Sequence, residues 1–257
     1  MASFSASPLA YVLLFIAAAV AGFVDSIAGG GGIITLPALL AAGLPPHLAL
    51  GTNKLQSSFG SLSATLRYRA GGMLRLRDIV PGLAATAVGA ALGALAVGAV
   101  SSRLLSLLIP IFLVCILVFM ALRPRFGLED GTRRLGWLPF WIGAGLALGF
   151  YDGFFGPGVG TFWAIALVSL AGLDMSAATA HTKAANFMSN IVSLAVFLAA
   201  GTVVLPLGLA MGLAQAGGAL LGSRMVLKRG APFVRTMLMV MTGAMIVYLV
   251  LKYWVLK

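Results

Sequence analysis

Two stretches of this chain share one plan, and that plan decides the fold. Residues 22–32 read Gly-Phe-Val-Asp-Ser-Ile-Ala-Gly-Gly-Gly-Gly, and residues 149–160 read Gly-Phe-Tyr-Asp-Gly-Phe-Phe-Gly-Pro-Gly-Val-Gly. In each stretch an apolar run ends at an aspartate, and a cluster of glycines follows. A helical glycine costs about 1 kcal/mol relative to alanine, and a helical proline costs about 3 kcal/mol. We therefore predict one helix break at residues 29–32 and a second at residues 156–160.

The likeness between the two halves extends beyond these breaks. Residues 51–54 read Gly-Thr-Asn-Lys, and residues 180–183 read Ala-His-Thr-Lys. Further on, the pair Gly89 and Gly93 has a counterpart in Gly218 and Gly222. Three matches in the same order indicate an internal duplication. We predict a first transmembrane repeat at residues 1–122, a cytoplasmic linker at 123–134 and a second transmembrane repeat at 135–257.

The composition places the chain in a membrane. Of its 257 residues, 61% are hydrophobic and only 9% are charged. Soluble domains are roughly 45–50% apolar and about 25% charged, so a soluble fold is excluded, and so is a disordered chain. Ten apolar runs follow one another, and a bilayer crossing needs about 20 apolar residues. We predict an all-α polytopic membrane protein of about 8–10 transmembrane segments, in which each repeat has one short glycine-broken helix and three full spans.

The charges predict orientation rather than a nucleic-acid partner. The net charge is +11, but the basic residues lie in short segments between apolar runs, without interleaved aromatic residues. In the first half a basic loop, residues 67–77, precedes the fourth run; its counterpart at 201–203 is uncharged, and the next pair of loops reverses this pattern. If the basic loops are all cytoplasmic, the two repeats are inverted relative to each other. We expect a multi-pass protein of the cell inner membrane that contacts the lipid bilayer and a small anionic substrate, with no nucleic acid and with homo-oligomerisation left open.

Inverted repeats with matching broken helices are typical of secondary transporters. An opened break exposes backbone N–H groups, and the half-helix that follows turns its positive end toward the gap, so an oxyanion is stabilised there. The alternative is that these glycines only allow close helix packing. The candidate substrate-binding glycines are Gly29, Gly30, Gly31, Gly32, Gly156 and Gly158.

Two lysines lie inside apolar runs, where each costs roughly 2.5–3.5 kcal/mol. Lys183, Asn186 and Asn190 share one helical face, and Lys54 is followed by a similar polar face. Such stripes suit a small anion, with an ammonium group for its charge and hydroxyls and amides for its oxygens. The alternatives are that each lysine reaches the membrane interface or pairs with an aspartate. The other candidates for substrate contact are Asn53, Thr182, Ser57 and Ser61.

Three further titratable residues have other candidate roles. Asp25 and Asp152 are expected to cap a broken helix, to pair with a lysine or to carry a coupling proton. His181 is a candidate for coupling or for hydrogen bonding. The chain has two distant histidines and no nucleophile motif, so we expect no enzymatic activity, no metal site and no cofactor.

In its Asp25–Gly32, Thr52–Ser61, Gly153–Gly158 and His181–Asn186 segments, the sequence resembles the sulfite exporter TauE/SafE family, most closely the broad YfcA-like branch. The resemblance covers nearly the whole chain. It implies a transporter of small anions, often sulfur oxyanions or organosulfonates, with the binding region on these two motif pairs. We therefore expect a secondary transporter that moves such an anion by alternating access. The alternative is an anion channel that uses the same polar stripes without moving gates.

Overall fold

The computed structural model describes residues 7–122 and 134–250, and within these ranges every regular element is helical. Each of the ten predicted apolar runs coincides with a helix, the last two with the two parts of α9, which bends at Gly230. The elements are α1 (Pro8–Ala28), α2 (Gly31–Ala41), α3 (Pro46–Ala70), η1 (Leu76–Ile79), α4 (Val80–Gly98), α5 (Ser102–Leu122), α6 (Trp137–Phe154), α7 (Val159–Ser169), α8 (Met175–Ala199) and α9 (Leu205–Val250).

The outer faces of these helices are apolar. By length and composition, four stretches of the described chain can each cross a bilayer: Pro8–Ala28, Leu76–Gly98, Met175–Ala199 and Leu205–Val240. Large apolar side chains such as those of Val12, Leu92 and Leu213 are more than half exposed. A water-soluble surface does not carry so many such residues, whereas lipid tails cover them without cost. The predicted all-helical, multi-pass membrane fold is confirmed.

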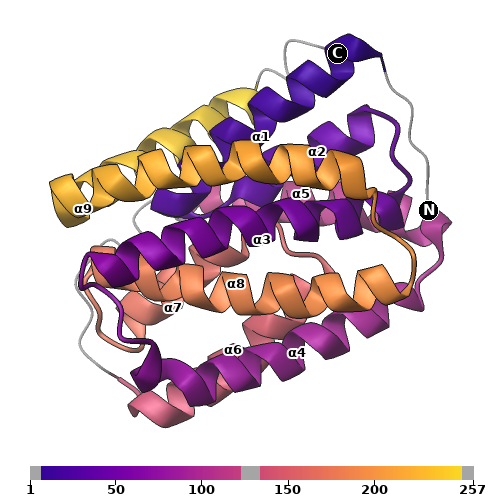
Figure 1. The fold of residues 1–257 in the computed structure, drawn as a ribbon. Helices are drawn as coiled ribbons and strands as arrows, with labels where there is room; N and C mark the ends of the chain where they lie inside the picture. The colour runs from indigo at the N-terminus through magenta and orange to yellow at the C-terminus, as the bar shows by residue number, and fades with distance from the viewer. Residues whose placement is uncertain (1–6, 123–133, 251–257) are drawn as a thin grey trace.

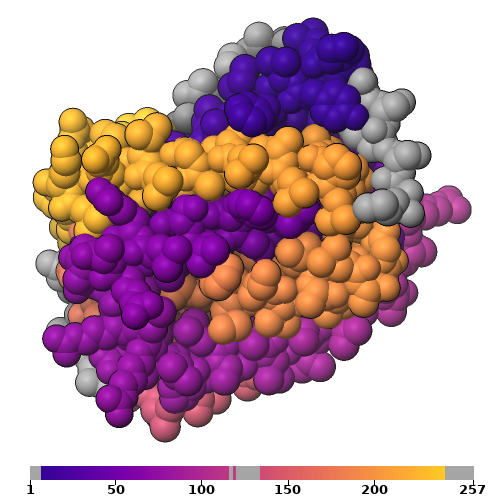
Figure 2. Space-filling model, viewed as in Figure 1, coloured from indigo at the N-terminus to yellow at the C-terminus, as the bar shows by residue number. Residues whose placement is uncertain are grey.

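Helices of the two halves are interleaved. Across the face shown in Figure 1, helices from the second and first halves alternate in the order α9, α3, α8 and α4. Figure 2 shows side chains of these four helices closing that face. Further contacts join α4 to α6 and α1 to α9. Each half therefore completes its packing against helices of the other.

The matched glycines make matched contacts. A Cβ atom at Gly93 in α4 would lie 2.1 Å from the backbone oxygen of Phe150 in α6. A Cβ atom at Gly218 in α9 would lie 2.0 Å from the backbone oxygen of Ala19 in α1. The fourth α-helix of each half thus packs on the first helix of the other half. This correspondence favours an internal duplication. The inverted orientation and the division at 123–134 stay predictions, and residues 123–133 lie outside the described chain.

Both predicted breaks are present, but each ends earlier than predicted, because α2 begins at Gly31 and α7 at Val159. The turn between α1 and α2 has left-handed backbone at Gly29 and Gly30, and the turn between α6 and α7 has it at Gly156 and Gly158. Helices α2 and α7 have 11 residues each, which is about 16 Å of helix and roughly half of a bilayer core. The turns cross in contact, because a Cβ atom at Gly29 would lie 2.6 Å from the backbone of Gly160. The sequence thus brings two half-span helices to one point at the centre of the protein.

Candidate substrate site at the crossing of the two helix breaks

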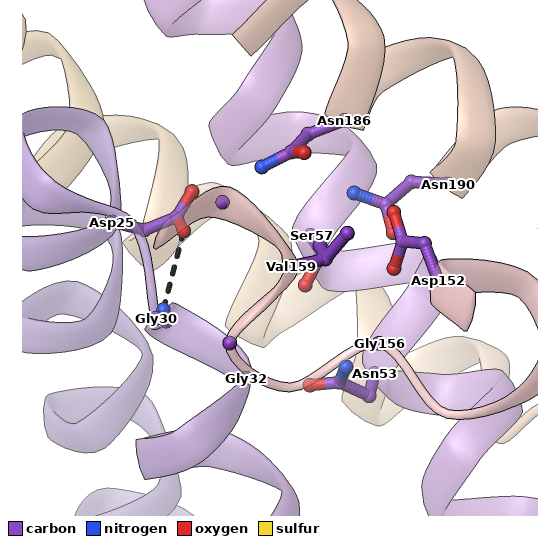
Figure 3. Close-up of a pocket in the computed structure, with 13 residues that line it drawn as sticks. Asp25, Gly30, Gly32, Asn53, Ser57, Asp152, Gly156, Val159, Asn186 and Asn190 are labelled. Carbon is purple, nitrogen blue, oxygen red and sulfur yellow. Dashed lines mark hydrogen bonds between the residues drawn. The ribbon is translucent and has the colours of Figure 1, made fainter. Parts of the chain in front are cut away.

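A small polar cavity lies where the two breaks cross (Figure 3). Its volume is about 30 Å³, counted as the space open to the centre of a water molecule, which accommodates one or two waters. Side chains from α1, α3, α6 and α8 meet the backbone of both turns around it. The lining residues are Asp25, Gly30, Gly31, Gly32, Asn53, Ser57, Asp152, Gly156, Gly158, Val159, Gly160, Asn186 and Asn190.

One ion pair ties the first half to the second on one side of this cavity. Lys54 in α3 donates to Oδ1 of Asp152 in α6 at 2.6 Å and also to the backbone oxygen of Asp152. Ser189 in α8 donates to the other carboxylate oxygen of Asp152. The side chains of Lys54 and Asp152 are only 1% and 3% exposed. The carboxylate is therefore held by two donors in a site closed to solvent.

A second ion pair lies at the corresponding place on the other side. Lys183 in α8 donates to Oδ2 of Asp25 in α1 at 2.9 Å. The other oxygen of Asp25 accepts the N–H of Gly31, the first residue of α2, at 3.2 Å, a bond that is dashed in Figure 3. Asp25 therefore pairs with a lysine and also caps the broken helix. Lys183 is 1% exposed, but the side chain of Asp25 is 16% exposed and lines the cavity.

The helix ends at the crossing carry partial charges of both signs. Helices α2 and α7 begin there, so their first N–H groups point toward the gap and favour negative charge. Helices α1 and α6 end there, and their last carbonyls favour a cation. Lys54 satisfies one of these carbonyls, that of Asp152. The starts of α2 and α7 can thus favour an anion, while Lys54 partly neutralises the end of α6.

Polar side chains complete the cavity wall. Asn186 and Asn190 extend from α8 toward the space between the breaks, and Ser57 faces them from α3 (Figure 3). The oxygen of the Asn186 amide is buried and has no hydrogen-bond partner. The amide oxygen of Asn53 accepts from Thr35 at 2.6 Å and from Gln56 at 2.9 Å, which leaves its amino group for the cavity. An amide amino group can donate to an oxygen-rich guest, whereas the unpartnered oxygen of Asn186 requires a donor such as a protonated group or water.

The other predicted site residues lie outside the cavity lining. Ser61 donates to the backbone of its own helix, and the hydroxyl of Thr182 is buried without a partner. His181 faces Trp137 and Trp141, and its Nδ1 bonds the backbone of Ala177. Gly29 packs against the backbone of Gly160 and Thr161 in the second break.

The lysines are behind the cavity wall rather than in it. A Cβ atom at Gly156 would lie 3.0 Å from Lys54 Nζ, and one at Gly160 would lie 3.5 Å from Lys183 Nζ. Both ammonium groups are buried and bonded to carboxylates, so neither reaches the membrane interface, and the sequence alternative of lysine–aspartate pairing describes this structure. Sequence reasoning missed the role of Ser189. No cluster of potential metal ligands occurs within residues 7–122 and 134–250.

Comparisons with known proteins agree with one another. The family model described as "Sulfite exporter TauE/SafE" matches residues 14–249. The chain is 45% identical to "Probable membrane transporter protein YfcA" of Escherichia coli strain K12, over 94% of this chain and 90% of the relative. It is also 45% identical to "Probable membrane transporter protein ORF9" of a Sinorhizobium species, over 92% and 90%. A "Probable membrane transporter protein" of Haemophilus influenzae is 41% identical over 91% of each chain. No solved structure was found to match.

Proposed function

This chain belongs to the sulfite exporter TauE/SafE family of membrane transporters, and we propose that it moves a small oxyanion across the membrane by alternating access. The class of anion we propose is a sulfur oxyanion or an organosulfonate. The observation that carries the proposal is the crossing of two broken helices around a cavity flanked by two buried ion pairs.

The buried charges support a functional site. Each lysine costs roughly 2.5–3.5 kcal/mol inside a membrane, and a well-packed apolar pair often replaces a buried ion pair at no loss of stability. The ammonium groups of Lys54 and Lys183 lie directly behind glycines of the cavity wall, where any side chain would separate them from the cavity. Together with the N–H groups of α2 and α7, they place positive charge around the cavity, which favours an oxyanion.

The size and lining of the cavity favour a small oxyanion. A sulfite or sulfonate group presents three oxygens, and several donors converge here from different helices. A cavity of about 30 Å³ holds a head group only after the surrounding helices move slightly apart. The sulfur chemistry itself rests on the family description rather than on the cavity, because carboxylates use the same donors.

The fold suits alternating access. One half-span helix comes from each half of the chain, and the two meet at the cavity from matching positions. Rocking of one group of helices against the other then opens the cavity to one side at a time. In the channel alternative, both sides are open together and nothing needs to move.

A binding screen followed by a flux assay tests this proposal. Purified protein is heated with sulfite, thiosulfate, sulfoacetate or acetate, and we expect a sulfur anion to raise the midpoint of thermal unfolding because it binds only the folded state. In proteoliposomes, flux of that anion saturates if the protein is a transporter. Lys183→Ala abolishes the flux, whereas Lys228→Ala, at an exposed lysine of α9, does not. Undiminished flux in Lys183→Ala contradicts the assigned site, and flux that never saturates favours the channel.

A further inference from the structure

The two ion pairs at the crossing are not equivalent, although their positions correspond. Asp152 is 3% exposed, and its carboxylate is held by Lys54 and Ser189. Asp25 is 16% exposed, lines the cavity, and is held by Lys183 and the N–H of Gly31. Both aspartates line the cavity, but the side chain of Asp152 is almost fully buried, whereas that of Asp25 is partly open.

One part of this difference, the serine donor to Asp152, is a difference in sequence between the two halves. Ser189 lies six residues after Lys183, and the residue six positions after Lys54 is Gly60. A Cβ atom at Gly60 would lie 2.7 Å from the side chain of Gln215 in α9. A serine matching Ser189 therefore does not fit in the first half as packed here. Asp25 lacks the donor that holds Asp152.

The Asp25 carboxylate occupies the place that suits a substrate oxyanion. One of its oxygens accepts from the buried ammonium group of Lys183, and the other accepts from the first N–H of α2. An ammonium group and a helix N-terminus are the two donors that an oxyanion seeks in a dry site. The carboxylate is thus an internal occupant of the anion site, and an incoming anion competes with it.

Charge balance decides what must accompany this exchange. Two lysines and two aspartates at the crossing sum to zero, so an added anion leaves one negative charge uncompensated. Isolated buried charge is strongly unfavourable in a low-dielectric interior. One proton taken from solution onto a carboxylate oxygen of Asp25 restores neutrality and breaks its bond to Lys183. The ammonium group then binds the substrate oxygen.

Few other titratable groups face Asp25. From α3, Tyr68 donates its hydroxyl to the backbone of Ser26, next to Asp25. Helices α2 and α7 contain no titratable side chain, and the described basic residues in the middle of α9, from Arg224 to Arg229, are exposed. Across the cavity, Asp152 remains bonded to Lys54. The exchange therefore depends on Lys183 and Asp25.

We propose that Asp25 is the coupling carboxylate of the transporter: it gives up Lys183 to the substrate anion and takes up one proton in return, while the Lys54–Asp152 pair stays closed. Anion and proton then move together in the same direction, one proton for each monovalent anion. This inference rests on the proposed anion transport, but it can fail while that proposal survives.

The test uses proteoliposomes of the full chain with a pH-sensitive dye inside and methanesulfonate as the probe anion, since this sulfonate stays ionised at any working pH. An inward anion gradient should acidify the lumen in the wild type. Asp25→Asn, a permanent mimic of the protonated side chain, should still exchange internal for external methanesulfonate but should move no protons. Ser189→Ala loosens the other pair and serves as the matched variant: it should keep one proton for each anion, whatever its rate.

The outcomes separate the two proposals. If the wild type carries no anion of any class in the screen, the proposed function fails. If the wild type carries the anion without acidifying the lumen, or if Asp25→Asn keeps the proton-to-anion ratio, the transport proposal survives and the coupling role of Asp25 is wrong. Loss of coupling in Ser189→Ala together with its retention in Asp25→Asn would assign the role to Asp152 instead. Asp25→Glu should recover coupling if a carboxylate is what the position requires.

Discussion

Replacing Lys54 with methionine keeps most of the side-chain volume but leaves the Asp152 carboxylate unpaired at 3% exposure, with Ser189 as its remaining side-chain donor. Breaking a buried ion pair in this way costs about 3–5 kcal/mol. Lys183→Met should cost less, about 1–3 kcal/mol, because Asp25 is 16% exposed and keeps the N–H of Gly31.

The assay is thermal unfolding of the purified protein in detergent, followed by intrinsic fluorescence. For a chain of this size, about 3–5 kcal/mol corresponds to a loss of about 6–20 °C in the midpoint. The double variant Lys54→Met with Asp152→Asn removes the orphan charge and should recover most of that loss. Equal losses for Lys54→Met and Lys183→Met, or a double variant as unstable as Lys54→Met, would refute the reasoning.

Three further substitutions test the packing and the breaks. Gly153→Ala in α6 should lower the free energy of unfolding by about 1–3 kcal/mol, because the new Cβ would lie 2.1 Å from a backbone oxygen of α4. The control is Gly143→Ala in the same helix, which should leave the stability unchanged because no atom lies within 4 Å of the new Cβ. Thermal unfolding compares the two variants. Gly156→Ala should abolish anion flux, because the new Cβ would lie within 3.0 Å of both members of the Lys54–Asp152 ion pair. Gly201 also has a left-handed backbone, but no atom lies within 4 Å of the position that a Cβ would take there, so Gly201→Ala carries the same backbone strain without a clash and should retain flux. Ser189→Ala should cost about 1–3 kcal/mol in the same unfolding assay, because it removes a donor from a buried carboxylate.

Local chemistry made the breaks predictable. Four consecutive glycines at residues 29–32 and the Gly-Pro-Gly sequence at 156–158 disfavour a continuous helix in any tertiary context. The composition likewise fixed the membrane class, and the apolar runs matched the helices closely. The interleaving of the halves could not be predicted from the sequence, because it depends on which helix packs against which. Hydrophobicity does not select the partner of a helix whose apolar faces are already surrounded by lipid.

The site was predictable in its members but not in its pairing. Lys54, Lys183, Asp25 and Asp152 stand out as charges in apolar surroundings, yet each lysine pairs with the aspartate of the other half, which no local pattern encodes. Ser189 escaped notice because it lies about 120° around α8 from Lys183, off the polar stripe.

Helix α3 shows the same limit at the level of composition. Its polar face, which includes Asn53 and Lys54, lies at the centre of the protein, so the average hydropathy of this 25-residue helix falls below that of the four stretches that qualify as spans. Surroundings, rather than average hydropathy, decide whether such a helix is buried in a membrane protein.

The central claim is that an anion binds where Asp25 now bonds Lys183 and the start of α2. An experimental structure with selenate bound, located by the anomalous scattering of selenium, tests this directly. We predict one strong peak in the cavity, in contact with Lys183 Nζ and the N–H of Gly31, with the Asp25 carboxylate displaced. A peak found only beside the exposed arginines of α9, with the Asp25–Lys183 bond intact at saturating selenate, would contradict the claim.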